Sequence, residues 1–484
     1  MPPISAFRPL AANPTLAGST HSWVACRVLF KTFLLLLLVG LTGCATAPSA
    51  PSERPALPVP STWSDNAIDG TQAAKIHWRQ FFPDPALQAL IVQALENNRD
   101  LRVAAARVEE ARAQYGLSRA ERLPSVGLTG SGALLGFPSD GSQATSERYD
   151  LGVSMLSYEV DFWGRLAGLS EAARYNYLAT EEARRWVHIG LVGDVASAYF
   201  GWLQARDTSE LARNTLVLRQ KTLDIIGKGK AGGVAYDLDY QSAAALEESA
   251  RSGLDGALHQ ETLARNRLNF LVGHAQGSLP EAGSLNDQQF DISLGPGLSS
   301  EVLLLRPDVA AAEQKLQAAH ANIGAARAAF MPRVVLTATA GLASLSLGNL
   351  FNGLAWAFQP SITQPLFDGG RLSAGLELAE ARKVVAVAEY ERTIQVAFRE
   401  VADLLSTRMV LSKQLQSALA SRNAQGKLLE IANARYGIGF SSYLEVLEAQ
   451  RAFLGASQAV VQIRRAQLDA ASQLYKALGG GGAV

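Results

Sequence analysis

The sequence contains one unit twice, and this repetition restricts the possible folds more than any other feature. Residues 100–132 and 308–340 align at a constant offset of 208. Further along the chain the offset becomes 206 and pairs residues 164–166 with 370–372. An alignment kept over so long a stretch predicts two halves with one architecture.

Each half shows the same order of predicted elements. An Ala-rich helical stretch, 84–122 in the first half, stops before Pro124, and its second copy stops before Pro332. Two strand-like segments with alternating apolar residues follow. Two long helical stretches close each half, at 166–228 and 236–271, then at 372–436 and 443–478. Roughly 60 helical residues reach about 90 Å, far longer than a globular helix needs.

The strand-like segments are each expected to hold about ten residues, the length of a transmembrane β-strand. In the first half, a loop rich in Gly, Pro and Ser at 136–142 is predicted to separate them. The apolar positions of the second strand in each half disagree under the offset of 206. This disagreement predicts a one-residue slip or β-bulge in one of the two strands.

Four strands with one apolar face cannot close a barrel alone, because their edges would leave unpaired backbone groups facing lipid. Several chains are therefore expected to share one barrel, which the long helices continue as a tube in the periplasm. A soluble four-stranded sheet capped by helices is the alternative, since alternation over short segments is weak evidence. A coiled-coil rod would fit the helices but not the strands.

The N-terminal region has the order of a secretory signal. Arg27 and Lys31 precede the apolar run 33–39, which is too short to span a bilayer as a mature anchor. The sequence 41–44, Leu-Thr-Gly-Cys, resembles the lipobox of bacterial lipoproteins. That resemblance implies cleavage before Cys44 and acylation of this cysteine; a plain signal peptide is the alternative. The long stretch before the basic residues suggests that translation starts further downstream.

The segments that follow from these patterns are a signal peptide at 1–43, a lipidated Pro-rich tether at 44–62, a first repeat at 63–295, and a second repeat with a C-terminal tail at 296–484. The other cysteine, Cys26, would leave with the signal.

Composition excludes several function classes. The 44 Lys and Arg balance the 44 Asp and Glu, which argues against a nucleic-acid partner. Two cysteines and six scattered histidines show no metal-ligand spacing. Gly227, Gly229 and Gly232 match a dinucleotide fingerprint but follow a helix rather than a strand. We therefore expect no enzymatic activity, no metal and no cofactor other than the lipid on Cys44.

Four segments resemble the signature segments of TolC-like outer-membrane efflux proteins, specifically the lipid-anchored NodT-type branch. They are YEVDFWGR at 158–165, LRPDV at 305–309, QPLFDGGR at 364–371 and SYLEVLEAQR at 442–451. The resemblance implies an α+β fold with an internal repeat. Three chains would build a 12-stranded outer-membrane barrel above a 12-helix periplasmic tunnel. Ala45 after the cysteine is, in such proteins, compatible with sorting to the outer membrane.

The same resemblance implies the function and the partners. The chain would be a homotrimeric, passive exit duct for small toxic compounds, in contact with outer-membrane lipid. A resistance-nodulation-division pump of the inner membrane would load it through a periplasmic adaptor protein. A duct for secreted polypeptides and a non-conducting structural lipoprotein are the alternatives. The cargo, the particular pump and the opening mechanism do not follow from the sequence.

In this family the two helix-to-helix turns at the periplasmic tip close the tunnel and carry acidic rings. The matching positions are Asp239, Tyr436, Glu445 and Glu448, with Phe440 as a further closing side chain and Gly233 and Gly439 in the turns. Like charges brought together by three-fold symmetry would repel one another and attract cations.

Structural alternatives exist for two of these assignments. Ser442 and Glu445 have the spacing of a capping box, and Asp239 has the position of a first-turn acid. The turn 439–442 lacks the basic residue that often locks such tips. Arg306-Pro307-Asp308 is read as a helix start.

Overall fold

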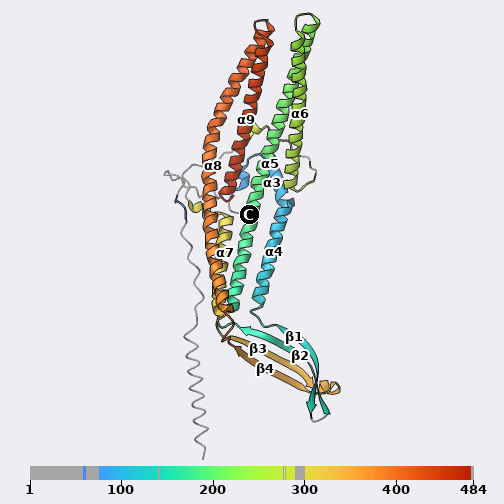
Figure 1. The fold of residues 1–484 in the computed structure, drawn as a ribbon, viewed down its shortest axis with the longest axis vertical. Helices are drawn as coiled ribbons and strands as arrows, with labels where there is room; N and C mark the ends of the chain where they lie inside the picture. Colours follow the sequence, from blue (N-terminus) through green and yellow to red (C-terminus); the bar gives the residue numbers. More distant parts are fainter. Residues whose placement is uncertain are drawn as a thin grey trace, which may run out of the picture. The chain divides into compact units, whose positions relative to one another are not determined.

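The computed structural model describes residues 58–61, 76–139, 142–275, 277, 279–288 and 300–480 (Figure 1). The chain divides into two compact units, residues 1–50 and 51–484, and every described residue belongs to the second. The predicted signal peptide, Cys44 and most of the predicted tether lie outside the described residues. The predicted boundary between the repeats, at 295–296, also lies outside the described residues.

The described elements follow one another in the same order in both halves. The first half contains α2 (Trp78–Phe81), α3 (Pro85–Asn97), α4 (Arg99–Ala120), β1 (Val126–Ser139), β2 (Ser142–Val160), α5 (Arg165–Ala231) and α6 (Asp237–Val272). The second contains α7 (Pro307–Ala328), β3 (Arg333–Ser344), β4 (Leu354–Thr363), α8 (Arg371–Gly437) and α9 (Tyr443–Ala477). Short 3₁₀ helices are η2 (Leu285–Asp287), η3 (Ser300–Leu305) and η4 (Leu347–Asn352).

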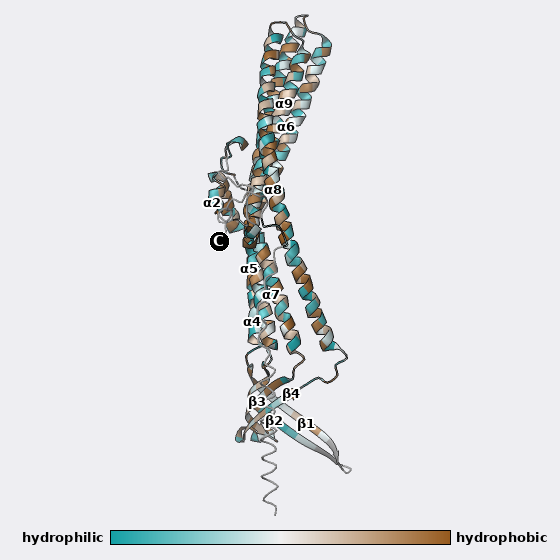
Figure 2. Cartoon of the chain, turned by 90° about the vertical axis from the view of Figure 1, so that its left-hand side faces the viewer, coloured by the Kyte–Doolittle hydropathy of each residue, from teal (hydrophilic) through white to brown (hydrophobic). Residues whose placement is uncertain are grey.

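The four long helices lie within three residues of their predicted bounds. Both α5 and α8 have 67 residues, which corresponds to about 100 Å at 1.5 Å per residue. Each forms a hairpin with the next helix, α5 with α6 and α8 with α9 (Figure 1). Figure 2 shows apolar and polar residues interspersed along these helices. Among the described helices, none combines the length and the apolar character needed to cross a membrane.

The starts of α5 and α8 have the same local design. Each follows a glycine with positive φ, Gly164 at +77° and Gly370 at +87°, a conformation that L side chains rarely adopt. An aspartate then accepts hydrogen bonds from the free N–H groups of the first turn. Asp161 bonds to the N–H groups of Leu166 and Ala167, at 3.1 and 2.7 Å.

One predicted helix is two helices in the structure. The stretch 84–122 is interrupted at Asn98, which ends α3 and caps α4 by accepting from the N–H of Leu101 at 3.0 Å. The Asn98 side chain also donates to the carbonyl of Leu271 at 2.9 Å. The expected end before Pro124 is confirmed, since α4 stops at Ala120, and α7 likewise stops at Ala328 before Pro332.

The start of α7 at Pro307 agrees with the predicted helix start. The Arg306 guanidinium is buried there between Asp308 at 2.7 Å and Glu400 of α8 at 3.0 Å. It also donates to the carbonyl of Ala477 at 2.8 Å. Burial alone would lower the pKa of Arg306, but the two carboxylates outweigh burial and raise it. Arg306 thereby ties α7 to α8 and to the end of α9.

The four strands form one antiparallel sheet in the order β1-β2-β3-β4. β1 and β2 have 14 and 19 residues, so the expected length of about ten was wrong for the first half. The predicted loop at 136–142 was also wrong, because β1 continues to Ser139 and β2 begins at Ser142. Cross-strand pairing outweighs the loop-like composition there. Pro138 is the second-to-last residue of β1, so the backbone donor that proline lacks is missing only at the end of the strand.

The predicted slip is confirmed as a bulge in β2. Met155 pairs with Ala338 and Tyr158 with Leu336, so two residues of β2 oppose one residue of β3. One of these two, Ser157, has a positive φ of 56°. Because of this extra residue, the apolar residues on both sides of the bulge lie on the same face of the sheet.

The helices bury two apolar clusters around the middle of the long helices. The first joins α3, α5, α6 and α9 around Tyr199 and Leu203. The second joins η3, α7, α8 and the end of α9 around Tyr390 and Val401. These clusters hold the two halves of the chain together, while the sheet and the hairpin ends extend away from them along the helices.

Candidate functional site

The strand register gives the sheet one apolar face. Paired residues of neighbouring strands point to the same side, so the register alone assigns the faces. The large apolar side chains of one face are Val126, Leu128, Leu134, Leu151, Val153, Met155, Tyr158, Val160, Val334, Leu336, Leu342, Leu354, Trp356, Phe358 and Ile362. Leu354 and Trp356 are 90% and 78% exposed. An exposed apolar surface of this kind marks a contact with lipid or with another protein.

The opposite face is built mainly from small and polar residues. Its polar members are Thr129, Ser131, Ser146, Arg148, Asp150, Ser154, Glu159, Arg333, Thr337, Thr339, Gln359, Ser361 and Thr363. Glu159 and Arg333 pair at the end of the sheet that joins the helices, and Arg148 and Asp150 form an ion pair near the middle of β2. Each charged member of this face is therefore paired with an opposite charge.

The sheet is joined to the helices by a compact charged junction. Arg165 of α5 makes two 2.8 Å hydrogen bonds to the Glu159 carboxylate, and Arg333 of β3 reaches the same carboxylate at 2.6 Å. The hydrogen bonding of Arg165 to Glu159 is the largest cause of the raised pKa of Arg165. Trp163 donates from its indole N–H to the carbonyl of Pro332 at 2.9 Å. The end of β2 and the start of β3 are thereby fixed together at the start of α5.

At the other end of the long helices, two glycines form the turns between paired helices. Gly233 and Gly439 have φ values of +77° and +78°. In the turn between α5 and α6, Lys230 and Asp237 form an ion pair, which lowers the pKa of Asp237. Asp239 lies in the first turn of α6, as its position in the sequence indicated.

The structure places the remaining predicted tip residues on the α8–α9 turn. Tyr436 is half-buried and its ring centre lies 5.7 Å from that of Tyr443. Phe440 is 75% exposed, so within one chain it packs against little. Glu448 is exposed and Glu445 half-buried.

The predicted capping box at Ser442 was wrong. Ser442 is the residue before α9, but its side chain makes no capping hydrogen bond. Glu445 instead lies 3.8 Å from Arg435 of α8, across the turn. The basic partner that the turn itself lacks therefore comes from the helix before it. The sequence contained Arg435, but nothing local indicated that it faces Glu445.

A further polar contact near the tips was missed from the sequence. Arg219 of α5 donates to the side-chain oxygen of Gln450 of α9 at 2.6 Å, and both residues are buried. No described carboxylate lies within ion-pair distance of this guanidinium. Tyr443 lies beside Arg219, and burial raises the pKa of its hydroxyl. The two hairpins thus meet through a buried cation with a neutral partner.

Both tips also present large apolar side chains to solvent. They are Val234, Tyr236 and Leu238 on the α5–α6 tip, and Ile438, Phe440 and Leu444 on the α8–α9 tip. These six side chains form a second exposed apolar surface at the tips of the two hairpins. It lies at the opposite end of α5 and α8 from the sheet.

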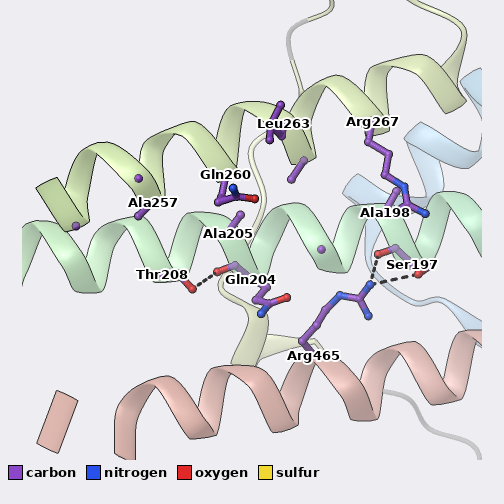
Figure 3. A pocket seen from close by; sticks show the side chains of 14 residues that line it. Ser197, Ala198, Gln204, Ala205, Thr208, Ala257, Gln260, Leu263, Arg267 and Arg465 are labelled. Atoms are coloured by element: carbon purple, nitrogen blue, oxygen red, sulfur yellow. Dashed lines mark hydrogen bonds between the residues drawn. The ribbon is translucent and has the colours of Figure 1, made fainter. Parts of the chain in front are cut away.

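A groove lies on α5 between α6 and α9, with a volume of about 580 Å³. Figure 3 shows Arg465 of α9 reaching toward Ser197 of α5, where it donates to the backbone carbonyl at 2.9 Å. Most lining residues are Gly, Ala, Gln or Thr, and no nucleophile with an adjacent base is among them. In the part of the chain that the structure describes, no group of His, Cys, Asp or Glu is placed to hold a metal ion.

Comparison with known proteins identifies the family. The model of the outer membrane efflux protein family matches residues 90–274 and again 298–480. The cation efflux system protein CusC of Escherichia coli K12 is 42% identical over 460 residues, covering 93% of this chain and 99% of CusC. The toluene efflux pump outer membrane protein TtgI of Pseudomonas putida is 40% identical over 473 residues, covering 94% of this chain and 99% of TtgI.

A solved structure agrees with these sequence relatives. The open state of the MtrE outer membrane channel of Neisseria gonorrhoeae superposes with a TM-score of 0.82 at 35% identity, covering 90% of this chain and 98% of MtrE. The family expected from the four signature segments is thus confirmed. This chain belongs to the outer membrane efflux protein family, with a location in the outer membrane and a function in efflux.

Proposed function

We propose that the chain forms the exit duct of a tripartite efflux pump, as a passive channel built from three copies. The observation that carries this proposal is the four-stranded sheet with one exposed apolar face and two unpaired edges, β1 and β4. Such a sheet is stable in lipid only when its edges are paired. The β1 edge of one copy and the β4 edge of the next supply that pairing.

The number of copies follows from the width of the barrel. Two copies would give eight strands, and an eight-stranded barrel is just wide enough for its own side chains. Three copies give 12 strands and leave a lumen. The apolar face then meets lipid, with Trp356 and Tyr158 among its aromatic side chains, and the polar face lines the lumen.

The helices support the same assembly. Within the chain, α7 and α9 each pack on both α5 and α8, whereas α4 and α6 have α5 as their main long neighbour. The free sides of α4, α6 and α8 are accounted for when copies stand side by side around a tunnel. In this assembly, the corresponding helices of the two halves of each chain are part of the same tunnel wall.

The tips are proposed as the gate of the tunnel. Three copies would bring Asp239, Glu445 and Glu448 into acidic rings that attract cations and repel one another. Arg435 near Glu445 reduces that repulsion and favours the closed arrangement, while Tyr436 and Phe440 narrow the opening. The exposed apolar side chains of both tips fit a periplasmic adaptor protein, which joins the duct to a resistance-nodulation-division pump.

The energy for transport is supplied by that pump. The chain has no phosphate-binding loop, and the described residues show no catalytic cluster, so we infer that it is not an enzyme and acts without a cofactor. The relatives are named for different cargo, cations for CusC and toluene for TtgI. One duct architecture thus serves unlike small compounds, and the pump is inferred to choose among them.

Cys44 is proposed to carry acyl chains that anchor the mature N-terminus to the outer membrane. Two or more chains bind a bilayer far more firmly than one, at about 0.8 kcal/mol per buried methylene.

Single-channel recording of the purified protein in planar bilayers tests the duct. The wild-type protein should show rare, small openings, and Glu445→Ala with Glu448→Ala should open more often. The conservative pair Glu445→Gln with Glu448→Gln separates charge from packing, because it removes only the charge. A protein that inserts but never conducts would be a structural lipoprotein, and unchanged openings in both pairs would reject the gate residues.

A further inference from the structure

Another groove runs along α7, which lies between α5 and α8 (Figure 1). Its volume is about 400 Å³, and seven of its 14 lining residues are Gly or Ala. The small side chains on α7 also let α5 approach closely, since a Cβ on Gly168 would lie 3.2 Å from the Cβ of Ala325. The groove therefore has an apolar floor of small side chains, to which Leu378 of α8, 51% exposed, adds a larger one.

The charged residues of this groove lie at its two ends. Arg165 is the first residue of α5 and lies at the end next to the sheet. At 1.5 Å per residue, Asn176 of α5 and Arg382 of α8 lie about 16 Å from the ends of their helices that adjoin the sheet. Lys315 lies about 20 Å from the corresponding end of α7. Three helices thus bring Asn176, Lys315 and Arg382 to a similar level at the far end of the groove.

The two ends differ in how their charges are compensated. Arg165 makes two 2.8 Å hydrogen bonds to Glu159. Lys315 and Arg382 are exposed, and no described carboxylate lies within ion-pair distance of either side chain. None of the described residues that line the groove carries a carboxylate. The far end therefore has two positive charges without a negative partner among the described residues, next to an apolar floor.

The groove continues the polar face of the sheet. Arg165 binds Glu159, a member of that face, and Arg333 of the same face reaches this carboxylate at 2.6 Å. Arg165 and Ala329 also line a pocket at the junction of sheet and helices, together with Glu159, Arg333 and Thr363 of the polar face. In the proposed duct this face lines the lumen, so the groove opens to the lumen as well.

We propose that the groove binds amphipathic anions on their way through the duct. The apolar chain of such a compound lies along the small side chains of the floor, and its acidic head lies between Lys315 and Arg382. Both cations form charge-assisted hydrogen bonds to the head, and the amide of Asn176 is a further donor. The inference rests on the proposed function and adds a class of cargo with the residues that contact it.

The shape of the groove explains why neither part of such a compound is sufficient alone. An acidic head without a chain stays hydrated, because Lys315 and Arg382 are exposed and salt screens their attraction. A chain without a charge gains only the burial of apolar surface in an open groove. An anion that joins both parts gains both contributions, and the open groove releases it again, as conduction requires.

Dansyl-undecanoic acid, a fluorescent fatty acid, tests this site, and its neutral methyl ester is the matched probe. Both are titrated into the purified full chain in phosphatidylcholine nanodiscs, and the signal of empty nanodiscs is subtracted. The acid should bind, and the ester should bind about tenfold more weakly because it lacks the charge.

Two double variants separate the site from the net charge of the protein. Lys315→Gln with Arg382→Gln should weaken binding of the acid about tenfold, because both partners of the acidic head are lost. Lys383→Gln with Lys413→Gln removes the same charge from α8 outside the groove and should bind as the wild type does. In planar bilayers, the acid should reduce the current through open channels, and the ester should not.

Equal binding of acid and ester would overturn this inference and leave the duct intact. An equal effect of the two double variants on binding would overturn it too. So would binding without any change in current, which would place the groove on the outer side of the wall. A protein that never forms a conducting channel would instead remove the proposed function itself.

Discussion

At the scale of single residues, Gly152 of β2 and Gly341 of β3 set how closely these two strands approach. They face each other on the polar side of the sheet. A Cβ on Gly152 would lie 2.6 Å from the carbonyl oxygen of Ala340, and one on Gly341 would overlap the carbonyl of Leu151. Only a residue without a side chain fits both positions, because the obstacles are backbone atoms that cannot rotate away.

Gly341→Ala should therefore destabilise the sheet by about 1–3 kcal/mol, the usual cost of overpacking. The expected result is a lower temperature at which the oligomer dissociates in detergent. Gly127→Ala in β1 is the control, because a Cβ there has no neighbour within 4 Å. Equal dissociation temperatures for the two variants would contradict the close-approach argument.

At the scale of elements, the two helical hairpins are joined near their tips by Arg219 and Gln450. A buried guanidinium that bonds only to an amide is costly, since its charge is poorly compensated. The contact between α5 and α9 is therefore weaker here than its burial suggests. A weak contact at this place suits the proposed gate, whose opening would separate the two hairpins.

Gln450→Glu should strengthen the contact by giving the cation a carboxylate. A gain of about 1–1.4 kcal/mol would reduce the frequency of channel opening by roughly fivefold to tenfold. Gln450→Met is the matched control, because it leaves the guanidinium without an acceptor and should increase opening. If both variants opened as often as the wild type in bilayer recordings, the contact would have no part in gating.

At the scale of the whole molecule, the sheet and the acyl chains proposed on Cys44 would be two separate means of membrane attachment. The sheet exposes a continuous apolar face from Leu354 to Ile362 along β4 alone. In the proposed trimer, twelve such strands would bury much more apolar surface than a few acyl chains would. The lipid is therefore expected to be dispensable once the barrel has formed.

Cys44→Ser, with residues 1–43 replaced by a conventional cleavable signal peptide, should lose labelling by radioactive palmitate. It should nevertheless stay in the outer-membrane fraction as an oligomer. Persistent labelling would disprove the lipid site at Cys44. Recovery in the soluble periplasmic fraction would show that the sheet alone does not attach the protein.

The sequence by itself determined the features that depend on neighbouring residues. The long helices, the helix ends before Pro124 and Pro332, and a bulge in one of the two second strands all follow from local periodicity, backbone restrictions and the comparison of the two halves. Internal repetition made these predictions sharper, because each element was seen twice and any disagreement between copies pointed to an irregularity.

Only the tertiary structure decided the features that join distant parts of the chain. Asn98 breaks a helix while its side chain reaches Leu271, and Glu445 faces Arg435 although its spacing from Ser442 indicated a cap. Arg219 meets Gln450 across 231 positions of sequence. Such contacts depend on how long helices are packed side by side, and a single sequence carries no local signal for which of their many polar residues come together.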